Sequence, residues 1–370
     1  MGTNFLKSTD KYLFGAKAAI LGLFSKKRPA PNNPKKILII KLWAIGDCVN
    51  SLPMIKKLKD NYPGCKITLL IKDNLKPVYS GHKFIDDIIV ARPENFFGIF
   101  CGKYDIAVDL EPYLNFSALI AWSASSHRVG FSHGIRSRLY QQAVPFDKER
   151  HIMKTYIDIA DTIIAGKNNA GSKNYPKDLI ALKYCDNAKN RVDKIFKNHG
   201  LKTSDKLIGF CASAGDSVKE RQWPKENFRD LAAQLVKKSR KNKILLIGTK
   251  NDFGLNEFIK NNNPSIINAS GEFGLEELFY AIKNADVFIS NDTGPMHIAA
   301  AQGVKTIGLF GPNTPKIWAP YGKKNISIFH PKKGCPYIDN TSHELAPRRL
   351  TEEQKSCMQS ITVNEVLRKI

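Results

Sequence analysis

Charged and polar side chains follow directly after several apolar, β-rich runs of this chain. The run Ile37–Leu42 is followed by Gly46 and Asp47, where a helix is expected to begin. Ligands of parallel α/β sheets bind beyond the carboxyl ends of the strands, so chemistry is to be sought at such turns. Gly46 permits a tight turn. Asp47 is either an N-cap, which spacing alone favours, or a general base, and the two roles are compatible.

A second turn, after the run Leu207–Ala212, carries the cations Lys219 and Arg221. This pair suits phosphate oxygens, because a guanidinium fork binds two of them at once. The alternative is a solvated loop whose basic residues have no special role. Ser213 superficially resembles a nucleophile elbow, but the first glycine of G-x-S-x-G is missing, so hydrolase chemistry is not expected there.

The third turn is the most specific pattern in the chain. It follows the run Val287–Ser290 and reads Asn291, Asp292, Thr293, Gly294, Pro295, Met296, His297. Proline suits the first turn of a helix. The N–H groups of Thr293 and Gly294 would then lie at a helix N-terminus, which favours anions. His297, taken alone, is more typical of a buried structural histidine than of a catalyst.

A fourth turn, Gly308–Pro315, is rich in glycine and proline and is interpreted as a rigid structural loop. Other motifs are absent from the sequence: it contains no G-x-G-x-x-G, no G-x-x-x-x-G-K-[ST], no H-E-x-x-H and no Asp-x-Asp. Dinucleotide-binding enzymes with a glycine fingerprint, P-loop NTPases and zincins are therefore not expected. The Asp-x-Asp metal clamp of many sugar-nucleotide enzymes is not expected either.

The elements that must position these turns form two series of alternating β-rich and amphipathic stretches. The first series predicts strands at Ile37–Leu42, Lys66–Ile71, Ile85–Val90 and Tyr104–Leu110, with helices at Val49–Asn61 and Asn115–Ala124. The second predicts strands at Leu207–Ala212, Lys243–Gly248, Ile266–Asn268, Val287–Ser290 and Thr306–Phe310, with helices at Asn187–His199, Asn227–Ser239, Gly254–Asn261, Leu275–Ala285 and Pro295–Gln302. This alternation is typical of an α/β protein with mainly parallel sheets. Capping boxes at Thr351–Gln354 and Thr362–Glu365 predict a short helical tail.

Length, composition and charge restrict the number of domains, the class of protein and the kind of partner. The 370 residues favour two domains, and 42% hydrophobic with 25% charged residues is ordinary for a globular protein. The formal net charge of +23 points to a polyanionic partner: nucleic acid, an anionic membrane surface or a phosphorylated substrate. Seven cysteines, an odd number without any C-x-x-C, are expected to be free thiols in a reducing cytosol.

Residues 1–36 differ from the rest of the chain, with eight basic residues against one acid, Asp10. Apolar residues recur there at helical spacing: Leu6, Leu13, Ala16, Ile20 and Leu23. One interpretation is a basic amphipathic helix in a membrane interface, and the other is a tail helix packed on the protein's own surface. Three prolines, Pro29, Pro31 and Pro34, form a linker after it. A signal peptide is not expected, and no apolar run approaches the ~20 residues that cross a bilayer.

Taken together, these strings resemble the family 9 glycosyltransferases, the bacterial ADP-heptose:lipopolysaccharide heptosyltransferases. The matching pieces run in the family's order over residues 35–370: Ile37–Lys41 through Gly46-Asp47 and Leu52-Pro53, Arg221–Pro224, Asn291–His297, Leu309–Pro312, Cys357-Met358, Ile361-Thr362 and Glu365-Val366. The sequence departs from the family pattern in two ways. It has fewer of the family's extra cysteines around Cys335, and its first 35 residues have no counterpart in the family.

The resemblance implies a GT-B architecture of two Rossmann-like domains facing across a cleft. The boundaries expected are 1–34 for the basic segment and linker, 35–180 for the acceptor-side domain, 181–204 for a linker helix, 205–345 for the nucleotide-sugar domain and 346–370 for a helical tail. It also implies inverting transfer without a metal or other cofactor, which agrees with the missing Asp-x-Asp.

Residue roles carry over from the resemblance position by position. Asp47 falls on the family's general base, and Arg221 falls on a basic residue that contacts the donor phosphates. Asp292 falls on the carboxylate that holds the sugar hydroxyls, and Thr293 with Gly294 falls on the phosphate-binding turn. Three further residues are assigned to donor binding, of which the last aligns loosely with a ribose-contacting acid: Lys219, His297 and Asp252.

The function expected is transfer of a heptose from ADP-heptose to a lipopolysaccharide core or a similar anionic glycolipid. The enzyme would work in the cytoplasm, peripherally on the inner face of the bacterial inner membrane, and an anionic membrane surface would be a partner. Transfer of another sugar, such as an N-acetylhexosamine, and sugar-nucleotide epimerisation on the same fold are the alternatives. Nucleic-acid binding rests on charge alone, without a recognisable binding module, and is not expected.

Overall fold

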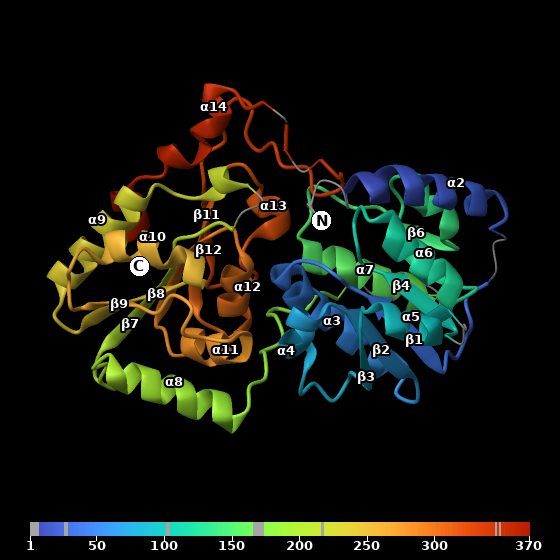
Figure 1. Ribbon diagram of the computed structural model, residues 1–370, viewed down its shortest axis with the longest axis horizontal. Coiled ribbons are helices and arrows are strands. Elements are labelled where there is room, and N and C mark those ends of the chain that lie inside the picture. Colours follow the sequence, from blue (N-terminus) through green and yellow to red (C-terminus); the bar gives the residue numbers. More distant parts are fainter. Residues whose placement is uncertain are drawn as a thin grey trace. The chain divides into compact units, whose positions relative to one another are not determined.

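The computed structural model describes residues 7–25, 29–100, 104–165, 174–215, 218–344, 346–347 and 349–370. The chain forms two compact units (Figure 1). The first unit comprises residues 1–176 with 339–345, and the second comprises residues 177–338 with 346–370. The helix expected as a linker therefore belongs to the second unit, as does the C-terminal tail.

The first unit contains a six-stranded parallel sheet with the order β3-β2-β1-β4-β5-β6. Its strands are β1 (Lys36–Ile40), β2 (Lys66–Ile71), β3 (Asp87–Val90), β4 (Ile106–Asp109), β5 (Arg128–Phe131) and β6 (Gln142–Val144). All four apolar residues of β1 are buried, as befits a central strand that is covered on both faces. This is the Rossmann strand order. Its topological switch point, where the order of the strands reverses, lies between β1 and β4.

Helices and turns cover this sheet. They are η1 (Asp10–Phe14), α2 (Gly15–Leu23), α3 (Ile45–Asn61), η2 (Asp73–Leu75), α4 (Lys76–Tyr79), α5 (Pro93–Phe100), α6 (Asn115–Ala124), η3 (Ile135–Leu139) and α7 (Ile152–Ala165). The predictions missed the strands β5 and β6 and the helices α4, α5 and α7. The two strands are short, and α7 pairs with α3 on one face of the sheet.

The second unit repeats the same topology. Its strands are β7 (Lys206–Cys211), β8 (Asn242–Ile247), β9 (Ile266–Asn268), β10 (Val287–Asn291), β11 (Lys305–Phe310) and β12 (Ile326–Phe329), all parallel in the order β12-β11-β10-β7-β8-β9. Read from β7, this is again the Rossmann order, with its switch point between β7 and β10. The expected α/β architecture is confirmed in both units.

The helices of the second unit include a C-terminal tail that packs into its core. They are α8 (Asp186–Asn198), η4 (Lys219–Arg221), α9 (Lys225–Lys238), η5 (Lys250–Asp252), α10 (Phe253–Lys260), α11 (Leu275–Lys283), α12 (Gly294–Ala301), α13 (Pro315–Trp318), α14 (Glu352–Lys355), η6 (Cys357–Ser360) and α15 (Val363–Leu367). The capping box predicted at Thr351–Gln354 begins α14, and at the second predicted box the Thr362 side chain caps α15 by accepting the Glu365 backbone N–H. Met358 lies in the core, and a Cβ at Gly311 would come within 2.7 Å of its sulfur, so glycine is required by this close approach.

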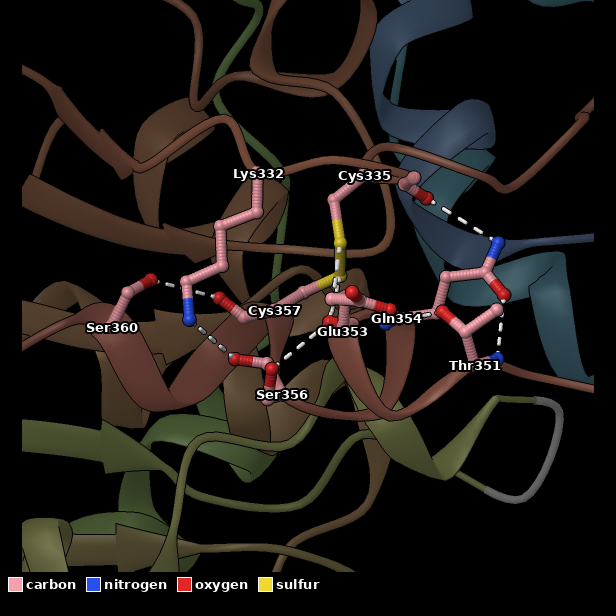
Figure 2. Close-up of a disulfide and its surroundings, with 9 residues drawn as sticks. Lys332, Cys335, Thr351, Glu353, Gln354, Ser356, Cys357 and Ser360 are labelled. Atoms are coloured by element: carbon pink, nitrogen blue, oxygen red, sulfur yellow. Dashed lines mark hydrogen bonds between the residues drawn. A yellow bond between two sulfur atoms is a disulfide. The ribbon is translucent and has the colours of Figure 1, made fainter.

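The expectation that every cysteine is free is wrong for one pair. Cys335, in the loop after β12, forms a disulfide with Cys357 at the start of η6 (Figure 2). A separation of 22 residues carries no spacing signal, and the two meet only because the tail returns to the sheet. Cys48, Cys65 and Cys211 are buried free thiols, and Cys185 is exposed and free. Cys101 lies outside the described residues.

The N-terminal segment packs on its own unit, as one of the two interpretations expected. Ala18 of α2 is buried in a cluster with Ala118, Leu139 and Tyr140. The Asp10 carboxylate accepts the backbone N–H groups of Asn115 and Phe116, at 2.9 and 2.8 Å, at the start of α6. No helix among the described residues is both long and apolar enough to span a membrane.

Candidate active site

Asp47 lies in the first turn of α3, directly after β1. The residue before α3 is Ala44, whose left-handed backbone (φ 63°) turns the chain from strand into helix. Gly46 is inside the helix, so assigning the turn to Gly46 and the N-cap to Asp47 is wrong: both belong to Ala44. The Asp47 side chain is 13% exposed and therefore keeps limited access to solvent.

A buried lysine and glutamate hold the loop that carries Asp47. Lys41 Nζ lies 2.9 Å from Glu111 Oε1 and 3.3 Å from Asp47 Oδ2. The same Glu111 oxygen accepts the backbone N–H groups of Leu42 and Trp43, at 2.6 and 3.0 Å. Burial acts to lower the pKa of Lys41, but the Glu111 and Asp47 carboxylates outweigh it and raise that pKa, so the lysine is charged at neutral pH.

Glu111 is in turn held by a second buried network at the end of β4. Its backbone N–H donates to Asp109 Oδ1 at 3.0 Å, and its carbonyl accepts from Arg136 Nη1. Arg136 Nη2 also pairs with Asp109 Oδ2 at 2.8 Å. Because β1 and β4 flank the switch point, Asp47 and Glu111 lie where a doubly wound sheet binds its ligand. The sequence analysis missed Glu111, although an acid directly after a predicted strand was the signal already used for Asp47.

Arg221 and Asp292 meet at the switch point of the second unit. Arg221 donates from Nη1 to the Asp292 carbonyl and from Nη2 to the Ala214 carbonyl, both at 3.2 Å. Its Nη1 is also 3.6 Å from Asp292 Oδ2, which accepts from Asn313 Nδ2 at 2.7 Å. Burial raises the pKa of the Asp292 carboxyl, although Arg221 and Asn313 act to lower it. The loops after β7 and β10 are thus joined by one guanidinium.

The turn after β10 forms the expected helix start. Thr293 is the N-cap of α12, and the helix begins at Gly294 with a proline in its first turn. Asn291 supports this turn from below: its Nδ2 donates to the Ala212 carbonyl at 2.8 Å, and its Oδ1 accepts the Trp223 backbone N–H at 3.0 Å. The sequence placed Asn291 in the motif without giving it this role. A helix N-terminus beside a guanidinium is a favourable binding site for an anion.

Three assigned donor-binding residues lie around this centre in different settings. Lys219 is exposed on η4, the turn that also carries Arg221. His297 is buried on α12, and burial lowers its pKa to about 4, so its ring is neutral at physiological pH. Asp252 follows β8, the neighbour of β7, and its Oδ2 accepts from the backbone N–H and hydroxyl of Thr249 at 2.7 and 2.8 Å. The Asp252 carboxylate is therefore engaged in the capping box at the start of η5.

Metal ligation finds no support in the described part of the chain, where no three His, Cys, Asp or Glu side chains are grouped so that they could hold an ion. The first switch point holds Asp47 beside the Lys41–Glu111 pair, and the second holds Arg221 beside Asp292 and the N-terminus of α12. A carboxylate such as Asp47 can accept a proton, and a guanidinium beside a helix N-terminus can bind an anion.

The family model described as glycosyltransferase family 9 (heptosyltransferase) matches residues 99–344. The chain belongs to glycosyltransferase family 9. The enzyme is therefore a glycosyltransferase, as the motifs indicated. The lipopolysaccharide heptosyltransferase 2 of Salmonella typhimurium is 27% identical over 351 residues, which are 87% of this chain and 98% of that protein.

Solved structures of the family share the fold. A family 9 glycosyltransferase from Veillonella parvula superposes with a TM-score of 0.69 at 25% identity, covering 81% of this chain and 87% of that one. The ADP-heptose lipopolysaccharide heptosyltransferase II of E. coli also superposes with a TM-score of 0.69, at 22% identity, covering 90% and 97%. The GT-B fold class is confirmed.

Proposed function

We propose that this family 9 glycosyltransferase transfers a heptose from ADP-heptose to a lipopolysaccharide core or a similar anionic glycolipid, with inversion and without a metal ion. Two of the three proteins named above support the donor and acceptor, because both are lipopolysaccharide heptosyltransferases and one is named for ADP-heptose. The observation that carries the mechanism is Asp47, held at the switch point of the first unit by the buried Lys41–Glu111 pair.

Inversion requires that the acceptor hydroxyl attack the anomeric carbon from the face opposite the diphosphate. As the new bond between acceptor oxygen and carbon forms, the bond to the diphosphate oxygen breaks, and the hydroxyl proton passes to the Asp47 carboxylate. The ammonium of Lys41 lies 3.3 Å from Asp47 Oδ2 and holds that carboxylate in place to receive the proton. The leaving nucleotide diphosphate gains negative charge in the same step.

Arg221 and the N-terminus of α12 supply fixed positive charge for that leaving group. Interactions that strengthen as charge develops accelerate the reaction, whereas equal binding of ground and transition states does not. We assign Asp292 to the sugar hydroxyls, Thr293 and Gly294 to the phosphates, and Lys219, His297 and Asp252 to the surrounding donor site. The lipid anchor of the acceptor would bring the enzyme to the cytoplasmic face of the inner membrane.

The decisive test compares Asp47→Asn with Asp60→Asn in α3. Asp60 is an exposed acid of the same helix, paired with Lys56, and serves as the matched control. A positioned general base is worth ~10²–10⁴ in rate, so Asp47→Asn should lower kcat by about that factor. Because Asp47 belongs to the first unit, the dissociation constant of ADP-heptose should stay near the wild-type value. Product mass and donor binding by calorimetry measure both quantities.

If Asp47→Asn instead weakens donor binding or lowers the stability of the protein while kcat stays at the wild-type value, Asp47 only supports the start of α3. If the wild-type enzyme forms no heptosylated product from ADP-heptose but uses another nucleotide sugar, the proposed donor is wrong and the proposed mechanism still stands.

A further inference from the structure

Helix α2 is attached to the first unit through a face of small residues. Gly15 and Ala18 are buried, and a Cβ added at Gly22 would lie 2.7 Å from the Arg138 Cβ. Small residues on this side let the helix backbone come close to η3 and α6, beside which it lies (Figure 1). The helix is therefore docked by close backbone contact together with Leu21, which packs against the buried cluster around Ala18, and with Phe14, which stacks on Phe116. Its other large apolar side chains take no part in docking.

Those larger side chains point away from the protein. Five of them are largely exposed: Tyr12 at 68%, Leu13 at 52%, Ile20 at 58%, Leu23 at 76% and Phe24 at 74%. They make up five of the nine large exposed hydrophobic side chains recorded in the described part of the chain. Leu13, Ile20 and Leu23 of the apolar stripe seen in the sequence thus face outward, whereas Leu6 lies outside the described residues. We call the five exposed residues the outer face. Apolar residues gathered in this way mark an interaction surface.

The outer face is held in place at its N-terminal end. Asp10 accepts two backbone N–H groups of α6, and His343 Nε2 lies 2.6 Å from the same carboxylate. Phe14 stacks against Phe116 of α6 with ring centroids 5.1 Å apart. The helix therefore presents its outer face as a preformed element, so little conformational entropy is lost when a partner binds.

Charge identifies the kind of partner. Lys17 is exposed on α2, and Arg138 is exposed beside Gly22. The first 36 residues hold eight basic residues against one acid, within a chain of net charge +23. An apolar face bordered by cations fits a surface that is apolar inside and anionic outside, which describes a bilayer with anionic headgroups.

We propose that the outer face of α2 is a membrane-docking surface that inserts into the boundary between headgroups and acyl chains of an anionic bilayer. The proposal deepens the proposed function, on which it rests for the lipid-linked acceptor. The chemistry recognised is the anionic lipid headgroup together with the apolar layer below it. The surface holds the enzyme where that acceptor is anchored.

The test is vesicle flotation of the full-length enzyme and two variants. Vesicles of phosphatidylglycerol with phosphatidylethanolamine should carry the wild type upward, and pure phosphatidylcholine vesicles should carry much less. The double variant Ile20→Glu, Leu23→Glu should lower the partition coefficient by about tenfold or more, because two anions replace apolar contacts at an anionic surface. Phe253→Glu, at a residue 54% exposed on α10 of the second unit, should float like the wild type.

Both variants should keep the wild-type thermal unfolding midpoint and the wild-type turnover of a soluble acceptor analogue. Flotation of the double variant at the wild-type level would overturn the proposal. So would a wild-type dimer in solution that the double variant abolishes without any change in flotation, because a second copy of the chain would then cover the face. Absence of heptosyl transfer with intact flotation would overturn the proposed function and leave the docking surface standing.

Discussion

At the scale of single residues, Arg221 joins two loops and is also the group that we propose to stabilise the leaving diphosphate. Its two terminal nitrogens donate to the carbonyls of Ala214 and Asp292, which belong to the loops after β7 and β10. The guanidinium is thereby held at the switch point with its charge only partly offset by the nearby Asp292 carboxylate. A lysine could supply the charge there but not the two directed bonds.

Replacing Arg221 should slow the reaction more than it weakens ground-state binding. Loss of one preorganised donor to a developing oxyanion commonly costs ~10²–10³ in kcat, and we expect Arg221→Ala to fall in that range. Arg229→Ala on α9, which removes a partly exposed arginine of the same unit, should leave kcat unchanged. EDTA should not inhibit the wild type. A strict requirement for Mg²⁺ or Mn²⁺ would contradict this account of leaving-group stabilisation.

At the scale of elements, helix α12 contains a buried ionisable side chain. His297 is 3% exposed, and burial lowers its pKa to about 4, below the value near 6.5 of an unfolded chain. Between these two values the unfolded state binds a proton that the folded state does not. Stability therefore falls as the pH falls from about 6.5 to about 4, and His297 adds no pH dependence above that window.

The difference corresponds to about 3 kcal/mol across the window. His297→Gln should flatten the dependence of the unfolding free energy on pH by roughly that amount, measured by urea denaturation at a series of pH values. Equal slopes for wild type and His297→Gln would show that the ring titrates freely in the folded protein.

Element prediction from the sequence succeeded where periodicity and burial coincide. The strands Lys66–Ile71 and Ile266–Asn268 and the helix Asn115–Ala124 have the predicted bounds, because each is a clean apolar or amphipathic run. The edge strand Gln142–Val144 was missed although it is as long as Ile266–Asn268, since alanine is uncommon in strands and only Val144 of the three residues is buried. The switch-point rule located Asp47, Arg221 and Asp292, but it could not show which partners hold them.

Those partners are distant in sequence. Glu111 is 70 residues from Lys41, and no local pattern reports that their side chains meet in the core. The Cys335–Cys357 bond depends in the same way on a tail that returns to its own sheet. The orientation of α2 also needed the structure, because an apolar stripe in sequence does not tell whether it faces inward or outward.

At the scale of the whole molecule, the proposed binding to an anionic bilayer would have two contributions, the net charge of +23 and the insertion of the outer face of α2. Charge acts over the Debye length, which shrinks from ~10 Å at 0.1 M salt to ~3 Å at 1 M. Apolar insertion does not weaken with salt in this way. The two contributions are therefore separable by ionic strength.

Raising NaCl over that range should lower kcat/KM for a phosphorylated soluble acceptor, because a distant anion is no longer attracted to the enzyme. An acceptor analogue from which the phosphates have been removed should show a much weaker salt dependence, and it is the matched control. Vesicle binding by the wild type should decline less steeply than kcat/KM, since the outer face still contributes when charges are screened. If both acceptors lose the same factor in kcat/KM, the salt acts on the enzyme itself and the excess charge does not steer the acceptor.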